Sequence, residues 1–194
     1  MISRYNDWDY DSMGLKVNEI LELESRKNFQ DYIAKIQKEY DYSIIRVNES
    51  DRFIRKFLEK NDYKMKEVIY EMYSKSPLQI KSTVSANCEI REECDSSELS
   101  NLAYNMFRHG RYLEDPEIPM KLANARNSSW VLQMYNSDLE RQYLFCREKL
   151  IGFLFYRTEE NIELVLGGVE NRYQHLSYYF WNELFQKYKR SNRI

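Results

Sequence analysis

The sequence predicts an α/β chain of the mixed α+β kind, for three reasons. Stretches with apolar residues at helical spacing alternate with short runs rich in β-branched and aromatic residues, which is typical of helices packed on a sheet. Hydrophobic residues make up 43% of the 194 residues and aromatic residues 15%, so the chain carries ample apolar area for a core. Five glycines and three prolines suit long helices and strands with few tight turns.

The first half of the chain is expected to alternate helices and strands. Residues 25–40 place apolar side chains at helical spacing behind a candidate N-cap at Ser25. Residues 42–47 are rich in β-branched residues and predict a strand. Asp51 is placed to cap a short helix, and residues 63–73 predict another strand.

A change in composition divides the chain. The periodic pattern loosens near Pro77, and the polar run over residues 88–95 follows it. We therefore expect an N-terminal α/β half-domain over residues 1–87 and a second domain over residues 88–194.

The second part predicts two helices, three strands and a further helix. Asp95-Ser-Ser-Glu98 resembles a capping box, so a helix is expected to start there. Two prolines within residues 115–119 break the chain, and a second helix follows to about Tyr135. The remaining elements are expected as strands over residues 142–147, 150–156 and 161–169, and a helix over residues 174–189.

Charge and composition argue against several function classes. The 29 basic and 31 acidic residues nearly balance and form no basic cluster, which argues against a nucleic-acid partner. The sequence contains neither G-x-G-x-x-G nor G-x-x-x-x-G-K-[ST], so it predicts no dinucleotide site and no P-loop. Cys88, Cys94 and Cys146 form no C-x-x-C pair and there are two histidines, so neither a disulfide framework nor a metal site is expected.

The sequence shows no membrane or export segment. Its longest apolar run, residues 150–156, is too short to span a bilayer. The N-terminus lacks the apolar region of a signal peptide. A cytoplasmic protein with no membrane partner is therefore expected.

Residues 142–189 carry the most informative pattern. A strand, a turn at Glu148-Lys149 and two more strands lead through Gly167-Gly-Val169 into a loop and an amphipathic helix. This order resembles the GNAT superfamily of N-acyltransferases, in which N–H groups of a [RQ]-x-x-G-x-[GA] loop and helix N-terminus hold the pyrophosphate of acetyl-CoA. The resemblance implies a mixed, mostly antiparallel sheet flanked by helices, with acetyl-CoA as the acyl donor.

The same resemblance implies which residues hold the donor. Val169 matches the last strand residue, whose backbone, alongside that of Gly167, would pair with the pantetheine arm. Gln174 matches the first loop position. His175 lies where it would contact a phosphate, although a polar residue at a helix start is the alternative reading of it.

Two loop positions depart from the superfamily pattern. Ser177 stands where the superfamily has glycine, and Tyr179 where it has glycine or alanine. Glycine lets the backbone approach a phosphate closely and adopt positive φ. This departure supports a second hypothesis, a catalytically inactive GNAT-like module that binds a ligand or partner. The orientation of Tyr179 separates the two hypotheses: a ring packed into the core would leave the loop open, whereas a ring across the N–H groups would block it.

Motifs outside the loop resemble amino-sugar-nucleotide N-acetyltransferases of the TDP-fucosamine type. Trp8-Asp-Tyr-Asp-Ser-Met-Gly14 is similar to their W-D-S-x-x-F-G opening. Arg111-Tyr-Leu-Glu-Asp-Pro116, followed by Trp130, is similar to their R-[FY]-x-x-D segment and helix. Gly152-Phe153 matches their I-x-G-[FY] strand. The resemblance implies that the acyl acceptor is a small amine, of which an amino-sugar nucleotide is one candidate.

The superfamily continues after the loop helix with further strands and a helix carrying a catalytic tyrosine, whereas this sequence stops at Ile194. We expect either a fragment or a substitute from residues 44–63, which have the same strand, helix, strand order. In that alignment Leu58 takes the tyrosine position and Asp62 a glycine position. A homodimer partner that pairs with an open edge strand is the alternative.

Glu163 is the candidate general base. It lies six residues before Val169, so alternation along a strand puts the two side chains on the same face. That position matches a base in several GNAT enzymes, and a carboxylate among apolar neighbours is placed to abstract a proton through water. A solvent-facing glutamate on an edge strand is the alternative.

Arg108 and Arg111 are candidates for substrate binding. Arginine suits bidentate contacts with phosphate, so both could bind a nucleotide diphosphate. Solvated surface arginines are the alternative.

Overall fold

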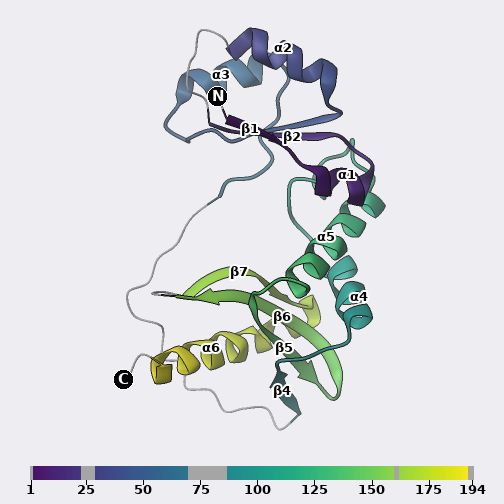
Figure 1. Ribbon diagram of the computed structural model, residues 1–194, viewed down its shortest axis with the longest axis vertical. Coiled ribbons are helices and arrows are strands. Elements are labelled where there is room, and N and C mark those ends of the chain that lie inside the picture. The colour runs from purple at the N-terminus through teal and green to yellow at the C-terminus, as the bar shows by residue number, and fades with distance from the viewer. Residues whose placement is uncertain (1, 23–28, 70–86, 160–161, 192–194) are drawn as a thin grey trace. The chain divides into compact units, whose positions relative to one another are not determined.

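The computed structural model of the protein describes residues 2–22, 29–69, 87–159 and 162–191 (Figure 1). These residues form two sheets flanked by helices, which confirms the predicted mixed α+β class. The chain divides into two compact units, Met1–Glu67 with Gly110–Arg126, and Val68–His109 with Asn127–Ile194. The division differs from the expected one at residue 87, because residues 110–126 pack with the N-terminal elements.

The first unit contains a three-stranded sheet in the order β1-β2-β3. Its strands are β1 (Ile2–Tyr5), β2 (Val17–Glu22) and β3 (Tyr42–Ile45). β1 and β2 are antiparallel, whereas β2 and β3 are parallel, which requires a crossover connection. The helices of this unit are α1 (Asp7–Met13), α2 (Phe29–Glu39) in the crossover, and α3 (Arg52–Lys60).

Alternation along β2 gives the first unit two cores. Ile20 packs with α2 and α3, in a cluster completed by Ile33, Ile36, Ile54 and Leu58. Val17 points to the opposite side, where it packs with Met13 of α1 and with Tyr112, Ile118 and Ala123 from the 110–126 segment. Asp51 caps α3 as predicted, since its side chain accepts the backbone N–H of Ile54. The strand expected over residues 63–73 does not form over residues 63–69, and its remainder lies outside the described residues.

The second unit contains a four-stranded antiparallel sheet in the order β4-β5-β6-β7. Its strands are β4 (Cys88–Arg91), β5 (Glu140–Cys146), β6 (Lys149–Thr158) and β7 (Ile162–Val169). The last three confirm the predicted strands. β4 lies in the polar run that marks the expected boundary between the two halves, where no strand is predicted, and it forms the edge of the sheet opposite β7.

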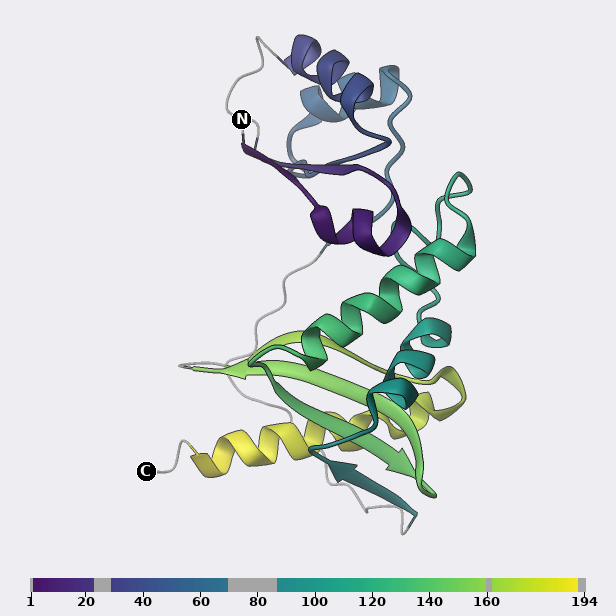
Figure 2. The same ribbon diagram turned by 45° about the vertical axis from the view of Figure 1, so that its right-hand side comes forward.

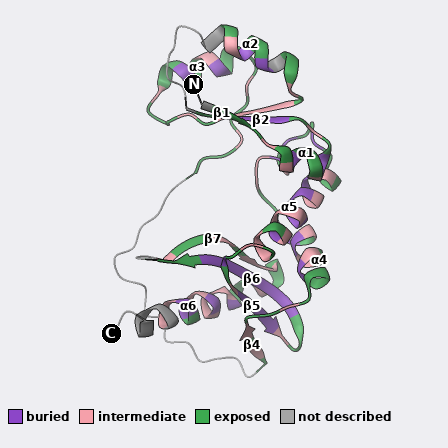
Figure 3. Cartoon of the chain, in the orientation of Figure 1, coloured by how far each residue is buried: buried purple, intermediate pink, exposed green. Residues whose placement is uncertain are grey.

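Helices cover both faces of this sheet (Figure 2). On the α4 face, α4 (Ser96–Met106) and the part of α5 (Met120–Tyr135) from Val131 onward pack against β5 and β6. On the α6 face, a short 3-10 helix, η1 (Asn171–Leu176), and α6 (Ser177–Ser191) pack against the same strands. Asp95 caps α4 as predicted, accepting the backbone N–H groups of Ser97 and Glu98. Figure 3 shows β6 buried along most of its length, so it forms the centre of this core.

No helix in the described part of the chain is both long enough and apolar enough to cross a membrane. Cys88, Cys94 and Cys146 form no disulfide bond with one another.

Candidate functional site

A pocket of about 760 Å³ lies at the end of β7, inside the second unit. One wall is α4, and the other is formed by the start of β6 and by the residues that follow β7. Its apolar part consists of Leu102, Met106 and Leu150. Its polar part combines three cationic side chains, two carboxylates and three amides, namely Arg108, Lys149, Arg172, Glu98, Glu170, Asn101, Asn105 and Asn171.

Two glycine contacts bring the walls of the pocket together. A Cβ on Gly168 of β7 would lie 2.7 Å from the Cε atom of Met106, so the glycine allows α4 to approach the strand closely. A Cβ on Gly152 of β6 would lie 2.9 Å from the carbonyl oxygen of Gly168. Gly152 therefore needs glycine for close packing rather than for an unusual φ, whereas the flexible end of the Met106 side chain could move to make room at Gly168.

Glu170 organises the cationic side of the pocket. It accepts a hydrogen bond of 2.7 Å from Lys149 Nζ, and it also pairs with Arg172. Partial burial would raise the pKa of Glu170, but the hydrogen bonds from Lys149 and Arg172 hold it below its usual value. Arg172 and Lys149 both lie over the ring of Tyr173. With Glu170 ionised, these two cations still leave this corner of the pocket positive.

The loop after β7 is built without left-handed backbone at Ser177. Ser177 has φ −59° and ψ −32°, and its N–H donates to the carbonyl of Gln174. The glycine of the superfamily pattern is therefore not required by the backbone at this position. Gln174 is exposed and donates to Asn171 Oδ1 at 2.8 Å, and His175 is exposed in the same short helix.

Tyr179 packs toward the sheet. Its half-buried ring contacts the core of the α6 face and lies 4.0 Å, centroid to centroid, from the ring of Tyr178. This is the arrangement expected to leave the loop open.

Gly167 and Val169 lie on the edge strand as expected. Gly167 pairs with Leu154 and Val169 with Gly152 of β6. Within the described residues, the other side of β7 pairs with no strand, so its backbone is available to an extended ligand.

The setting predicted for Glu163 is wrong in two respects. The register between β6 and β7 shifts at Phe155/Tyr156, so β7 carries one extra residue between Leu164 and Leu166. This bulge reverses the alternation. Glu163 consequently lies opposite Arg157, whereas Val169 packs on the α6 face.

Glu163 is also not among apolar side chains. Its side chain is 65% exposed and accepts a 3.0 Å hydrogen bond from Arg157 Nη1. Glu163 is therefore a solvent-facing glutamate on an edge strand, which is the alternative given for it above.

The two arginines predicted to bind substrate belong to different units. Arg108 is exposed and lines the pocket of the second unit. Arg111 lies in the first unit, where its Nη1 atom is 3.8 Å from Glu19 Oε1 and 3.6 Å from Glu67 Oε1.

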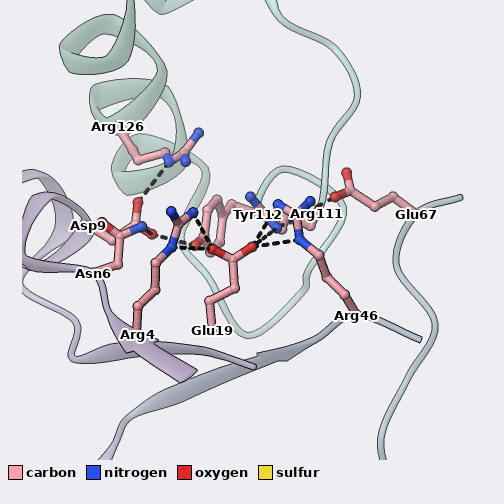
Figure 4. A network of polar contacts seen from close by, with 9 residues as sticks. All are labelled: Arg4, Asn6, Asp9, Glu19, Arg46, Glu67, Arg111, Tyr112 and Arg126. Atoms are coloured by element: carbon pink, nitrogen blue, oxygen red, sulfur yellow. Dashed lines mark hydrogen bonds and ion pairs between the residues drawn. The ribbon is translucent and has the colours of Figure 1, made fainter. Parts of the chain in front are cut away.

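A buried polar network in the first unit joins the two outlying motifs (Figure 4). Asp9 is fully buried and accepts hydrogen bonds from Asn6 Nδ2 at 2.7 Å, Tyr112 Oη at 2.8 Å and Arg126 Nε at 2.9 Å. The guanidinium of Arg126 also lies over the ring of Trp8. Both the Trp8-Asp9 segment and the Arg111-Tyr112 segment thus have a structural role, fixing α1 to residues 110–126.

Sequence reasoning missed most of the pocket. Lys149 was interpreted as a turn residue, and Glu170 and Arg172 lie between the strand and loop positions of the superfamily pattern. Nothing in local sequence indicates that α4 lies against them. Within the described residues, no group of His, Cys, Asp and Glu is arranged to hold a metal ion.

Comparison with known proteins found no matching family model, no matching curated protein and no matching solved structure.

Proposed function

We propose that the second unit is the core of an N-acyltransferase that binds acetyl-CoA in the pocket at the end of β7. The observation that carries the proposal is the pocket itself, in which apolar and cationic side chains lie next to the residues that follow β7. The order β5, β6, β7, loop and α6 supports it, because that order carries the sequence resemblance.

The residues present fit the donor in three ways. Leu102, Met106 and Leu150 offer apolar surface to the pantetheine arm. Arg108 and Arg172 offer guanidinium groups to its phosphates. The backbone of Gly167–Val169 offers N–H and C=O groups to the two amides of the arm.

The reaction is acyl transfer to an amine. The amine nitrogen forms a bond to the thioester carbonyl carbon, the carbon–sulfur bond breaks, and the amine loses a proton while the thiolate gains one. Hydrogen-bond donors must stabilise the oxyanion that forms, and backbone N–H groups of β7 are suited to this role. The acceptor that the sequence resemblance favours is a small amine of the amino-sugar-nucleotide class.

A second candidate function is a binding module without turnover. The observation that favours it is the exposed, ion-paired position of Glu163, which removes the expected general base from the pocket. Such a module binds a ligand or a partner. If its ligand is acetyl-CoA, it shares the site with the enzyme and differs from it in catalysis.

Calorimetric titration with acetyl-CoA and with free CoA tests the proposal. We expect saturable binding of both, weakened about tenfold by Arg172→Gln through loss of a charge-assisted hydrogen bond. Asn105→Trp, at an exposed position lining the pocket, should block binding. Arg157→Gln is the matched control, since it removes an equally charged, exposed arginine outside the pocket.

Thiol release in the presence of a panel of amines then separates the two functions. Binding with thiol release supports the enzyme, and binding without it for every amine supports the binding module. Absence of heat and of thermal stabilisation at millimolar acetyl-CoA would overturn the enzyme and leave a module that binds another ligand or a partner.

A further inference from the structure

Three arginines converge on one buried carboxylate in the first unit. Glu19, in the middle of the sheet, is only 2% exposed. Arg4 donates to its Oε2 atom from Nε at 3.0 Å and from Nη2 at 2.6 Å. Arg46 donates to its Oε1 atom from Nε at 2.8 Å. Figure 4 shows Arg111 pointing at the same carboxylate from another side, and its nearest nitrogen is 3.8 Å away.

Among the residues that the structure describes, the cluster carries more positive charge than its carboxylates neutralise. The three guanidinium groups are matched by Glu19 and, on the side of Arg111, by Glu67 at 3.6 Å. One well-paired arginine is enough to neutralise a buried carboxylate. The neighbouring Asp9 contributes no further compensation, because it is paired with Arg126. The excess charge is unfavourable unless an anion or solvent offsets it.

The guanidinium groups are both held and accessible. Glu19 fixes those of Arg4 and Arg46, so their orientation is set before any ligand arrives. Each guanidinium has five N–H donors, and the hydrogen bonds to Glu19 use at most two of them. The Arg4 side chain remains 59% exposed and that of Arg46 48% exposed. Unused donors on both side chains are therefore open to solvent.

We propose that Arg4, Arg46 and Arg111, arranged around Glu19, form a binding site for a phosphoryl group. Planar guanidinium groups match phosphate oxygens in pairs, and three of them around one point favour a multiply charged anion over a single carboxylate. The site lies wholly in the first unit and does not depend on the acetyl-CoA proposal. The phosphoryl group comes either from a free phosphate or from a nucleotide, and the test distinguishes these sources.

Calorimetric titration of the full chain with inorganic phosphate, pyrophosphate and uridine diphosphate tests the site. We expect pyrophosphate to bind saturably, and Arg4→Gln or Arg46→Gln each to weaken binding roughly tenfold. Each variant leaves Glu19 paired with the other arginine. Arg111→Gln is a further test variant. Arg111 lies 3.8 Å from Glu19 and does not hydrogen-bond to it, so this substitution removes no hydrogen bond from the buried carboxylate.

Two controls locate the binding. Arg157→Gln removes an exposed arginine from the second unit, and Arg172→Gln removes one from its pocket. Neither should change the pyrophosphate binding that Arg4→Gln and Arg46→Gln weaken. A second binding event that disappears only in Arg172→Gln would lie in the pocket proposed for the phosphates of acetyl-CoA. If uridine diphosphate binds much more tightly than pyrophosphate, the ligand is a nucleotide. If the two bind with equal affinity, the ligand is a free phosphate.

The proposal is overturned if no probe binds at millimolar concentration. It is also overturned if binding survives Arg4→Gln, Arg46→Gln and Arg111→Gln, or is lost in Arg172→Gln instead, since the anion would then occupy the other unit.

Discussion

Replacing Asp9 by asparagine tests the buried network of the first unit. Asp9 is fully buried, and its carboxylate accepts hydrogen bonds from Asn6, Tyr112 and Arg126. The change Asp9→Asn keeps the shape but removes the charge and turns one acceptor atom into a donor. Arg126, itself buried, loses its ion pair.

The expected cost follows from these contacts. Breaking a buried ion pair by removing one partner costs about 3–5 kcal/mol, since the remaining charge stays buried. The amide oxygen still accepts one hydrogen bond, so we expect the lower end of this range, about 3 kcal/mol. The effect is large compared with the usual 5–15 kcal/mol stability of a folded domain.

Urea denaturation followed by far-UV circular dichroism measures this loss in the free energy of unfolding. Asp11→Asn is the matched control, because Asp11 lies exposed on the same helix, and its effect should stay within about 0.5 kcal/mol. Equal stabilities of Asp9→Asn and Asp11→Asn would show that the ion pair between Asp9 and Arg126 does not stabilise the fold.

Three further predictions concern the sheets. Burial would raise the pKa of Glu19, but hydrogen bonds from Arg4 and Arg46 lower it below its usual value, so its ionised form stabilises the fold. Urea denaturation across pH should therefore show that the wild type exceeds Glu19→Gln in unfolding free energy by a constant amount above pH about 4.3, the pKa of glutamate in the unfolded chain. The difference should shrink as the pH falls below that value. Gly152→Ala should cost about 1–3 kcal/mol of unfolding free energy by the same assay, because its Cβ would meet a backbone oxygen at 2.9 Å. Diamide should link Cys88 to Cys146, detected by peptide mapping, because the two are direct partners across β4 and β5 and pack on one face.

Each of these has a result that would count against it. A stability difference that does not change with pH would show that Arg4 and Arg46 do not lower the pKa of Glu19. Rescue of Gly152→Ala by Val169→Ala would mean that a side chain, and not the Gly168 oxygen, causes the clash. A diamide product that joins Cys94 to either partner would contradict the β4–β5 register.

Local signals predicted the elements that carry strong local patterns. The capping residues Asp51 and Asp95 fixed the starts of two helices, because a cap is a contact between near neighbours. The apolar runs of β5, β6 and β7 were equally clear. β4 was missed because its charged residues alternate with half-buried ones on an edge strand, so its composition resembles a loop.

The candidate site was less predictable, because it depends on backbone irregularity and on contacts between residues distant in sequence. One extra residue in β7 moves Glu163 away from the face of Val169, and a bulge has no side-chain signature in a single sequence. The pocket depends on α4 lying against residues 149–150 and 170–172, which are distant in sequence. The polar network of Asp9 and Arg126 likewise joins residues that only the folded chain brings together.

Hydrogen–deuterium exchange of the full chain with and without acetyl-CoA tests whether the donor binds in this pocket. We expect slower exchange in the peptides that cover the end of β7 with η1, and in those that cover α4, because both walls of the pocket would contact the donor. Arg172→Gln should reduce this protection, and Arg157→Gln should not. If saturating acetyl-CoA leaves exchange in both segments unchanged, or slows it only outside them, the donor does not bind in this pocket.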